Sequence, residues 1–140
     1  MPSQNIDSIT TIFQSRLKTL DHLLKSAQKH FNGSESFLQE RIVSDMFPLG
    51  TQVVFTCNQP RNFALWCDRK PMDNLDPEVL SLTQVHEHIA NTNRLLSAIN
   101  TKDEKLGENT RIDLGKDLYI EMSGCAYVND SLMPNFYFHM

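Results

Sequence analysis

The sequence predicts a mainly α-helical bundle with one small β-hairpin placed before its last helix. Three stretches of the chain repeat apolar residues at steps of three and four, which is the period of one face of an α-helix. A fourth stretch, residues 111–122, alternates apolar and polar residues, as a half-buried β-strand does. Together the two periods predict helices that pack into a bundle and a hairpin that interrupts their order.

The first helix is expected over residues 6–31 and has the clearest pattern in the chain. Its N-cap is expected at Asp7 or Ser8, whose side-chain oxygens can accept a hydrogen bond from the first turn, and Gly33 is the expected stop. The apolar face of this helix consists of Ile6, Ile9, Phe13, Leu17, Leu20, Leu24, Ala27 and Phe31. Such a helix would be about 37 Å long at about 1.5 Å per residue.

A second helix is expected to begin near Asp45. This aspartate can cap the helix, since Pro48 would then lie in the first turn, where its missing N–H is no loss. Pro60 is expected to kink the helix rather than end it, because the apolar period continues beyond it. The apolar face consists of Leu49, Val53, Cys57, Pro60, Ala64 and Cys67.

Residues 68–80 contain two prolines and several Asp and Asn residues, and they predict a long surface connection. A third helix follows, with Ser81 or Thr83 as its expected cap. The polar run 100–104 is expected to end this helix. Its apolar face consists of Val85, Ile89, Thr92, Leu96 and Ile99.

The hairpin is expected around the turn Gly115-Lys116-Asp117. Further on, Pro134 and the aromatic residues after it predict the first turn of another helix. The sequence ends at Met140, so this final helix is expected to be truncated. Because the chain shows no internal repeat and no low-complexity segment, residues 1–140 are predicted to form a single domain.

Composition argues against several classes of function. The 140 residues carry a net charge of −4 and their 13 Lys and Arg are scattered, so no nucleic-acid partner is expected. No apolar run approaches a membrane span, and the N-terminus lacks the blocks of a signal peptide, which predicts a cytoplasmic protein that does not bind membranes. Cys57, Cys67 and Cys125 have no Cys-x-x-Cys spacing and are expected to be reduced, small apolar residues.

Two motifs carry a family resemblance. They are Asp45-Met46-Phe47-Pro48-Leu49 with Gln52-Val53, and Pro134-Asn135-Phe136-Tyr137-Phe138-His139. Both resemble signature segments of the uncharacterised family numbered nineteen ninety-three in the domain-of-unknown-function series, within the DinB-like superfamily of helical bundles. The resemblance extends over most of the chain, and it implies a cytoplasmic DinB-like four-helix bundle, often dimeric, with a ligand cleft between the helices.

The resemblance also bears on metal binding. Some members of the superfamily bind a divalent metal through three histidines, one early in the second helix and two at His-x-x-x-His spacing in the last. Some of these are thiol-dependent transferases or isomerases. Here Gln52 stands early in the second helix, and His139 is not followed by a residue four positions further on. No metal and no other cofactor is therefore expected.

The candidate cleft residues are Asp45, Gln52, Asn135, Tyr137 and His139. His139 follows aromatic residues and is expected to enter the core, where it would hydrogen-bond to the backbone or to an acid such as Asp45. In a functional interpretation it is instead a general base or the remnant of a metal site, and Asn135 and Tyr137 could support either. Gln52 would be a buried polar residue that needs partners, or a ligand contact.

The remaining histidines and the large aromatic residues have simpler interpretations. Most of the other four histidines are expected to be solvated surface residues; they are His22, His30, His86 and His88. His86 and His88 are two positions apart on a helix, so their side chains diverge and cannot easily share an ion. Phe136, Phe138 and Trp66 are expected in the core.

Two functions therefore remain open. The first is a non-catalytic bundle that binds a small molecule or forms a homodimer through its incomplete face. The alternative is a DinB-like thiol-dependent transferase or metal-assisted enzyme that uses His139. The sequence contains neither the Gly-x-Ser-x-Gly elbow of a serine nucleophile nor a phosphate-binding glycine loop.

Overall fold

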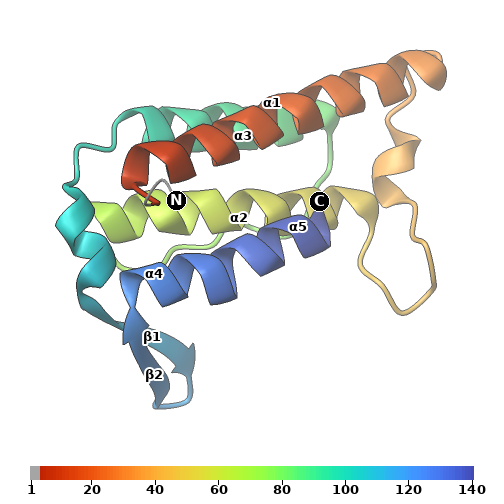
Figure 1. The fold of residues 1–140 in the computed structure, drawn as a ribbon. Coiled ribbons are helices and arrows are strands. Elements are labelled where there is room, and N and C mark those ends of the chain that lie inside the picture. The colour runs from red at the N-terminus through yellow and green to blue at the C-terminus, as the bar shows by residue number, and fades with distance from the viewer. Residues whose placement is uncertain (1–3) are drawn as a thin grey trace.

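The computed structural model describes residues 4–140, and it confirms the mainly helical fold with a hairpin before the last helix (Figure 1). The main helices are α1 (Ile6–His30), α2 (Leu49–Cys67) and α3 (Leu82–Ser97). The strands β1 (Asn109–Gly115) and β2 (Leu118–Ser123) pair antiparallel. The final helical segment consists of α4 (Gly124–Ala126), the π-helical η3 (Tyr127–Leu132) and α5 (Met133–His139). Two 3₁₀ turns, η1 (Ser36–Gln39) and η2 (Asp103–Gly107), lie in the connections.

Helix α1 begins earlier than its predicted caps. Asn5 is the N-cap, and its side chain accepts a hydrogen bond from Ser8 N, while the Ser8 hydroxyl accepts one from Asn5 N. Asp7 and Ser8 therefore lie inside the helix, and Ser8 completes a capping box from the third helical position. The predicted stop is confirmed, since the helix ends at His30 and Gly33, shortly after the C-cap residue Phe31, has a φ of 87°.

Helix α2 begins at Leu49, and its predicted cap is wrong. Pro48 is the N-cap residue and no side chain caps the helix, while Asp45 is exposed in the preceding loop. The physical reason lies in the backbone, because Leu49 N donates to the carbonyl of Glu40 at 2.8 Å and so already has a partner. The helix continues through Pro60 to Cys67, as the apolar period predicted.

The long connection and the third cap are confirmed. No helix or strand lies between Cys67 and Leu82, and the Ser81 side chain accepts a hydrogen bond from Gln84 N as the cap of α3. The hairpin has the predicted position, with Lys116 and Asp117 at φ values of 50° and 63° in its two-residue turn. Its link to the bundle includes buried Ile112 and a hydrogen bond from Trp66 Nε1 to the Thr110 hydroxyl.

The final helical segment starts well before its predicted position. Pro134 does lie in the first turn of α5, but helical backbone already begins at Gly124, where Ser123 caps the segment. Pro134 has no N–H to donate into the preceding turn, and the backbone before it widens into the π-helical η3. The whole segment extends along the bundle, and α5 packs beside α2 (Figure 1).

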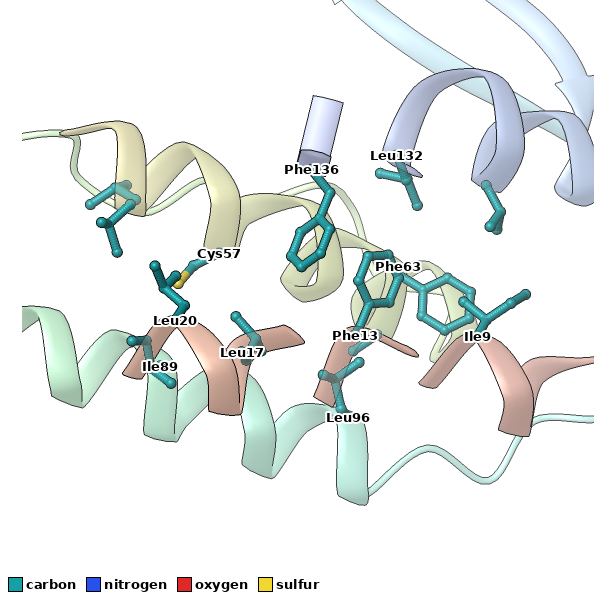
Figure 2. Packing of buried hydrophobic residues seen from close by; sticks show 14 of the residues in the cluster. Ile9, Phe13, Leu17, Leu20, Cys57, Phe63, Ile89, Leu96, Leu132 and Phe136 are labelled. Carbon is teal, nitrogen blue, oxygen red and sulfur yellow. The ribbon is translucent and has the colours of Figure 1, made fainter. Parts of the chain in front are cut away.

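The core joins three helices through aromatic rings. Phe13 of α1 contacts Phe63 of α2 and Phe136 of α5, with ring centroids 5.7 and 5.0 Å apart, and the three side chains point toward one another (Figure 2). Trp66 and Phe136 are buried as expected, but Phe138 is 76% exposed. The core prediction for Phe138 is wrong because two residues correspond to about 200° of helical rotation, which turns it away from Phe136.

The cysteines divide between core and surface. Cys57 and Cys67 are buried and free, as expected, and burial raises the pKa of Cys57 to about 12 and that of Cys67 to about 11. Cys125 is exposed instead, near the start of the final helical segment. Among residues 4–140, no helix has the length and apolar character that a membrane crossing requires.

Candidate functional site

The structure brings His139 and Gln52 into direct contact. His139 Nδ1 lies 2.7 Å from Gln52 Oε1, so the last residue of α5 is joined to the first turn of α2. Gln52 Nε2 lies 3.5 Å from the carbonyl oxygen of Phe47, a long contact that favours the orientation in which the amide oxygen faces the imidazole. Because an amide oxygen can only accept, Nδ1 carries the proton and Nε2 keeps a free lone pair.

Burial keeps this imidazole neutral. His139 is half-buried, and desolvation lowers its pKa below the ordinary value of 6.5. Its ring lies against Phe55 with centroids 5.1 Å apart, and Phe47 in turn contacts Phe55 edge-on. At neutral pH the cleft therefore presents a hydrogen-bond acceptor in aromatic surroundings rather than a positive charge.

His139 lies at the junction of two pockets. The outer pocket, of about 310 Å³, lies between His139, Gln52 and the loop before α2. Its apolar lining consists of Ile42, Met46, Phe47, Leu49, Phe138 and Met140. The amide pocket, of about 340 Å³, shares His139 with the outer pocket. Its lining consists of His139 with Phe55, Asn58, Gln59, Asn74, Leu75 and Pro77.

Side chains of α2 hold one wall of the amide pocket in place. Asn58 Oδ1 accepts a hydrogen bond from Leu75 N at 2.9 Å, and Asn62 Oδ1 accepts one from Asp73 N at 3.0 Å. The Thr51 hydroxyl donates to the carbonyl of Pro77. These bonds fasten the connection between α2 and α3 along the helix, so this wall of the pocket is formed without a ligand.

The other predicted cleft residues lie outside both pockets. Asp45 is exposed in the loop before α2. Asn135 is exposed and donates to the carbonyl of Ser131, while Tyr137 is half exposed on the outer side of α5. Of the predicted set, the structure thus brings together Gln52 and His139. Sequence reasoning missed Asn58, although Asn58 and Asn62 are poor helix formers placed four residues apart inside an otherwise apolar helix.

The remaining histidines lie away from this cleft. His22 and His30 are exposed, as expected, whereas His86 and His88 are half-buried. His86 Nδ1 pairs with Asp21 Oδ1 in the groove between α1 and α3. Burial opposes ionisation of Asp21, but the hydrogen bonds from Lys25 and His86 lower its pKa below the ordinary value. The Nε2 atom of His88 is buried without a partner among the described residues.

The cleft does not fit a metal ion of the kind that some DinB-like proteins hold. Between residues 4 and 140, no three His, Cys, Asp or Glu side chains are grouped closely enough to hold one. At the cleft itself, one imidazole meets one amide, and a catalytic metal site needs about three protein ligands. His139 and Gln52 therefore satisfy each other and act as a hydrogen-bonded pair.

The helix order and the hairpin before the final helix are those of a DinB-like helical bundle. The fold is similar to the crystal structure of a DinB family member from Shewanella denitrificans, with a TM-score of 0.71 and 17% sequence identity over 96% of this chain and 77% of that one. The chain belongs to the family described as Domain of unknown function (DUF1993), which it matches over residues 6–140. No curated protein matches it. The family resemblance of the two motifs is confirmed.

Proposed function

We propose that the protein binds a small molecule in the His139 cleft, by which we mean the outer pocket and the amide pocket together. The observation that carries this proposal is a neutral, half-buried imidazole with a free Nε2, fixed by Gln52 where two pockets meet. Pockets that combine apolar walls with a few oriented polar groups are the usual setting for ligand recognition.

The geometry supports binding more directly than catalysis. His139 contacts an amide and aromatic rings, and no carboxylate, hydroxyl or thiol among the described residues forms a hydrogen bond with it. A buried thiol such as Cys57 is also a poor nucleophile, since its pKa is about 12. The thiol-dependent alternative requires a thiol at the cleft, and no cysteine of the described residues lines either pocket.

The test is a protein-observed NMR titration with a library of neutral, anionic and cationic fragments. We expect some fragments to shift the imidazole signals of His139 and the side-chain amide signals of Gln52. The variant His139→Ala should lose these fragments, whereas His22→Ala, which alters an exposed histidine of α1, should keep them. A parallel titration with Zn²⁺ checks the metal-assisted alternative, which predicts saturable binding that His139→Ala removes.

Two outcomes would overturn the binding proposal. One is a library in which no fragment perturbs His139 or Gln52 in the folded wild-type protein. The other is a set of fragments that bind His139→Ala as well as they bind the wild type. Both outcomes can be distinguished from unfolding, because the amide spectrum of the same experiment shows whether each variant is folded.

A second function, homodimer formation, is favoured by an apolar patch at the same end of the molecule. The patch consists of Ile42, Phe47, Leu49, Phe138 and Met140, which are all exposed and all line the outer pocket. Exposed apolar residues gathered in this way mark an association surface. We propose that two copies pack patch against patch, since a self-complementary contact of this kind closes into a symmetric dimer.

The dimer is tested by light scattering on the wild type and on two matched variants. Phe138→Asp places a charge in the patch, where the side chain is 76% exposed, and should shift the mass from dimer to monomer. Leu80→Asp adds the same charge at a side chain that is 77% exposed and lies in the connection before α3, and it should leave the mass unchanged. A wild-type protein that stays monomeric at micromolar concentration would contradict this proposal.

A further inference from the structure

The amide pocket has a chemical character that narrows the class of ligand. Its lining includes no Asp, Glu, Lys or Arg side chain. Three of its residues are amides, namely Asn58, Gln59 and Asn74, and three are apolar, namely Phe55, Leu75 and Pro77. A pocket without a charged side chain gives an ionic ligand no partner to offset the loss of its hydration.

Asn58 supplies a fixed donor to this pocket. The residue is 5% exposed, and its Oδ1 is occupied by the hydrogen bond from Leu75 N, which sets the orientation of the amide. Its Nδ2 has no hydrogen-bond partner among residues 4–140, and it is not sealed from solvent either. Asn58 lines the amide pocket, and we infer that this unpartnered N–H group faces it.

Acceptors stand beside this donor. Gln59 Nε2 donates to the carbonyl of Phe55, which leaves Gln59 Oε1 as a free acceptor on the next residue of the helix. His139, on the opposite element, contributes a neutral ring whose Nδ1 is engaged with Gln52. A ligand that carries both an acceptor and a donor on one planar group can therefore satisfy both sides of the pocket.

We propose that the amide pocket binds an uncharged planar carboxamide, whose carbonyl accepts from Asn58 Nδ2 and whose N–H donates to Gln59 Oε1 or His139 Nε2. The apolar part of such a ligand packs between Phe55, Leu75 and Pro77. This inference rests on the proposed binding function, since His139 lines the pocket, and it adds the class of ligand. Recognition of this ligand depends on Asn58. Its Nδ2 would donate to the ligand, while its Oδ1 holds the pocket wall through Leu75 N.

The experiment compares three probes of nearly identical shape: benzamide, which is neutral, benzoate, which is an anion, and benzamidinium, which is a cation. Protein-observed NMR titrations at neutral pH are expected to show benzamide binding with the weak affinity of a small fragment and shifting the amides of Asn58 and Leu75. The two charged probes should bind at least about tenfold more weakly, since neither finds an ion-pair partner.

The variant Asn58→Asp tests the donor itself. It keeps an oxygen for Leu75 N, so the pocket wall is retained, but it replaces the Nδ2 donor with a charged acceptor. Benzamide should then bind about tenfold more weakly, and benzamidinium should become the preferred probe. Asn91→Asp, which adds the same charge to an exposed position on α3, should leave the wild-type order of the probes unchanged.

The outcomes separate this inference from the function on which it rests. If charged fragments perturb His139 while benzamide does not, the cleft binds ligands and the carboxamide class is wrong. If benzoate or benzamidinium binds the wild type as well as benzamide does, the class is also wrong. If Asn58→Asp does not fold, the order of the three probes on the wild type still decides the question.

Discussion

At the scale of single residues, His139 makes a pH-dependent contribution to stability. Burial lowers the pKa of its imidazole below 6.5, so the folded state resists protonation more than the unfolded chain does. The stabilising effect is complete above a pH of about 6.5 and is lost as the pH falls toward the lower pKa of the folded state. His88, whose pKa burial also lowers, contributes in the same direction.

The prediction for His139 concerns this acid range. The free energy of unfolding of the wild type should fall more steeply between neutral and mildly acidic pH than that of His139→Gln, which cannot take up the proton. Urea unfolding at a series of pH values measures the difference, and NMR titration of the imidazole should give a midpoint below 6.5. Parallel stability curves for the two proteins would contradict the assigned burial of the ring.

Gly124 is a residue at which even a methyl group does not fit. A Cβ atom built there would lie 2.7 Å from the ring of Trp66 and 2.8 Å from the carbonyl oxygen of Lys105. Gly124→Ala should therefore lower the free energy of unfolding by about 1–3 kcal/mol, because a buried ring or the backbone must shift. Gly107→Ala is the matched control, since its Cβ would meet nothing within 4 Å, and chemical denaturation compares the two.

At the scale of elements, the capping box of α1 is a local source of stability. Asn5→Ala removes the side chain that accepts from Ser8 N and should cost about 1 kcal/mol. Ser26→Ala, at an exposed position inside the same helix, should change stability by less than about 0.5 kcal/mol. Thermal unfolding followed by circular dichroism measures both, and an equal effect of the two substitutions would show that the box contributes nothing.

The elements that the sequence predicts well are those whose signal is local. Helices α1, α2 and α3 follow from the apolar period, and the hairpin follows from alternation around a turn in which Lys116 and Asp117 adopt positive φ. The early start of the final helix was not predicted, because Gly124-Cys125-Ala126-Tyr127-Val128 has neither a strong helical period nor a high helix propensity. Packing on α2 provides the stabilisation that local sequence does not.

Long-range partners limited the prediction of the cleft and of the caps. Asp45 was a reasonable cap by residue type, but Leu49 N finds the carbonyl of Glu40, a backbone group that no residue preference reveals. Gln52 and His139 were singled out through family motifs, and their contact joins residues 87 positions apart. The hydrogen bond that Asn58 accepts from Leu75 N was missed because it depends on where Leu75 lies, which only the folded connection determines.

At the scale of the whole molecule, one aromatic contact joins the N-terminal helix to the C-terminal one. Phe13 and Phe136 meet edge-on with centroids 5.0 Å apart, next to Phe63 of the central helix α2 (Figure 2). The same helix α5 that buries Phe136 presents His139 to Gln52 and Phe138 to the apolar patch. We therefore expect stability, the proposed ligand binding and the proposed dimer to depend together on the docking of α5 on α2.

This coupling predicts a sharp contrast between two phenylalanines in one helix. Phe136 is 0% exposed and Phe138 is 76% exposed, so Phe136→Ala opens a cavity in the core whereas Phe138→Ala removes surface. The first should lower the free energy of unfolding by about 3–5 kcal/mol and the second by less than about 0.5 kcal/mol, measured by urea unfolding at concentrations where the protein is monomeric. Phe136→Ala should also weaken fragment binding at His139, since α5 loses its main anchor to α1. Equal losses for the two variants would mean that α5 does not dock as described.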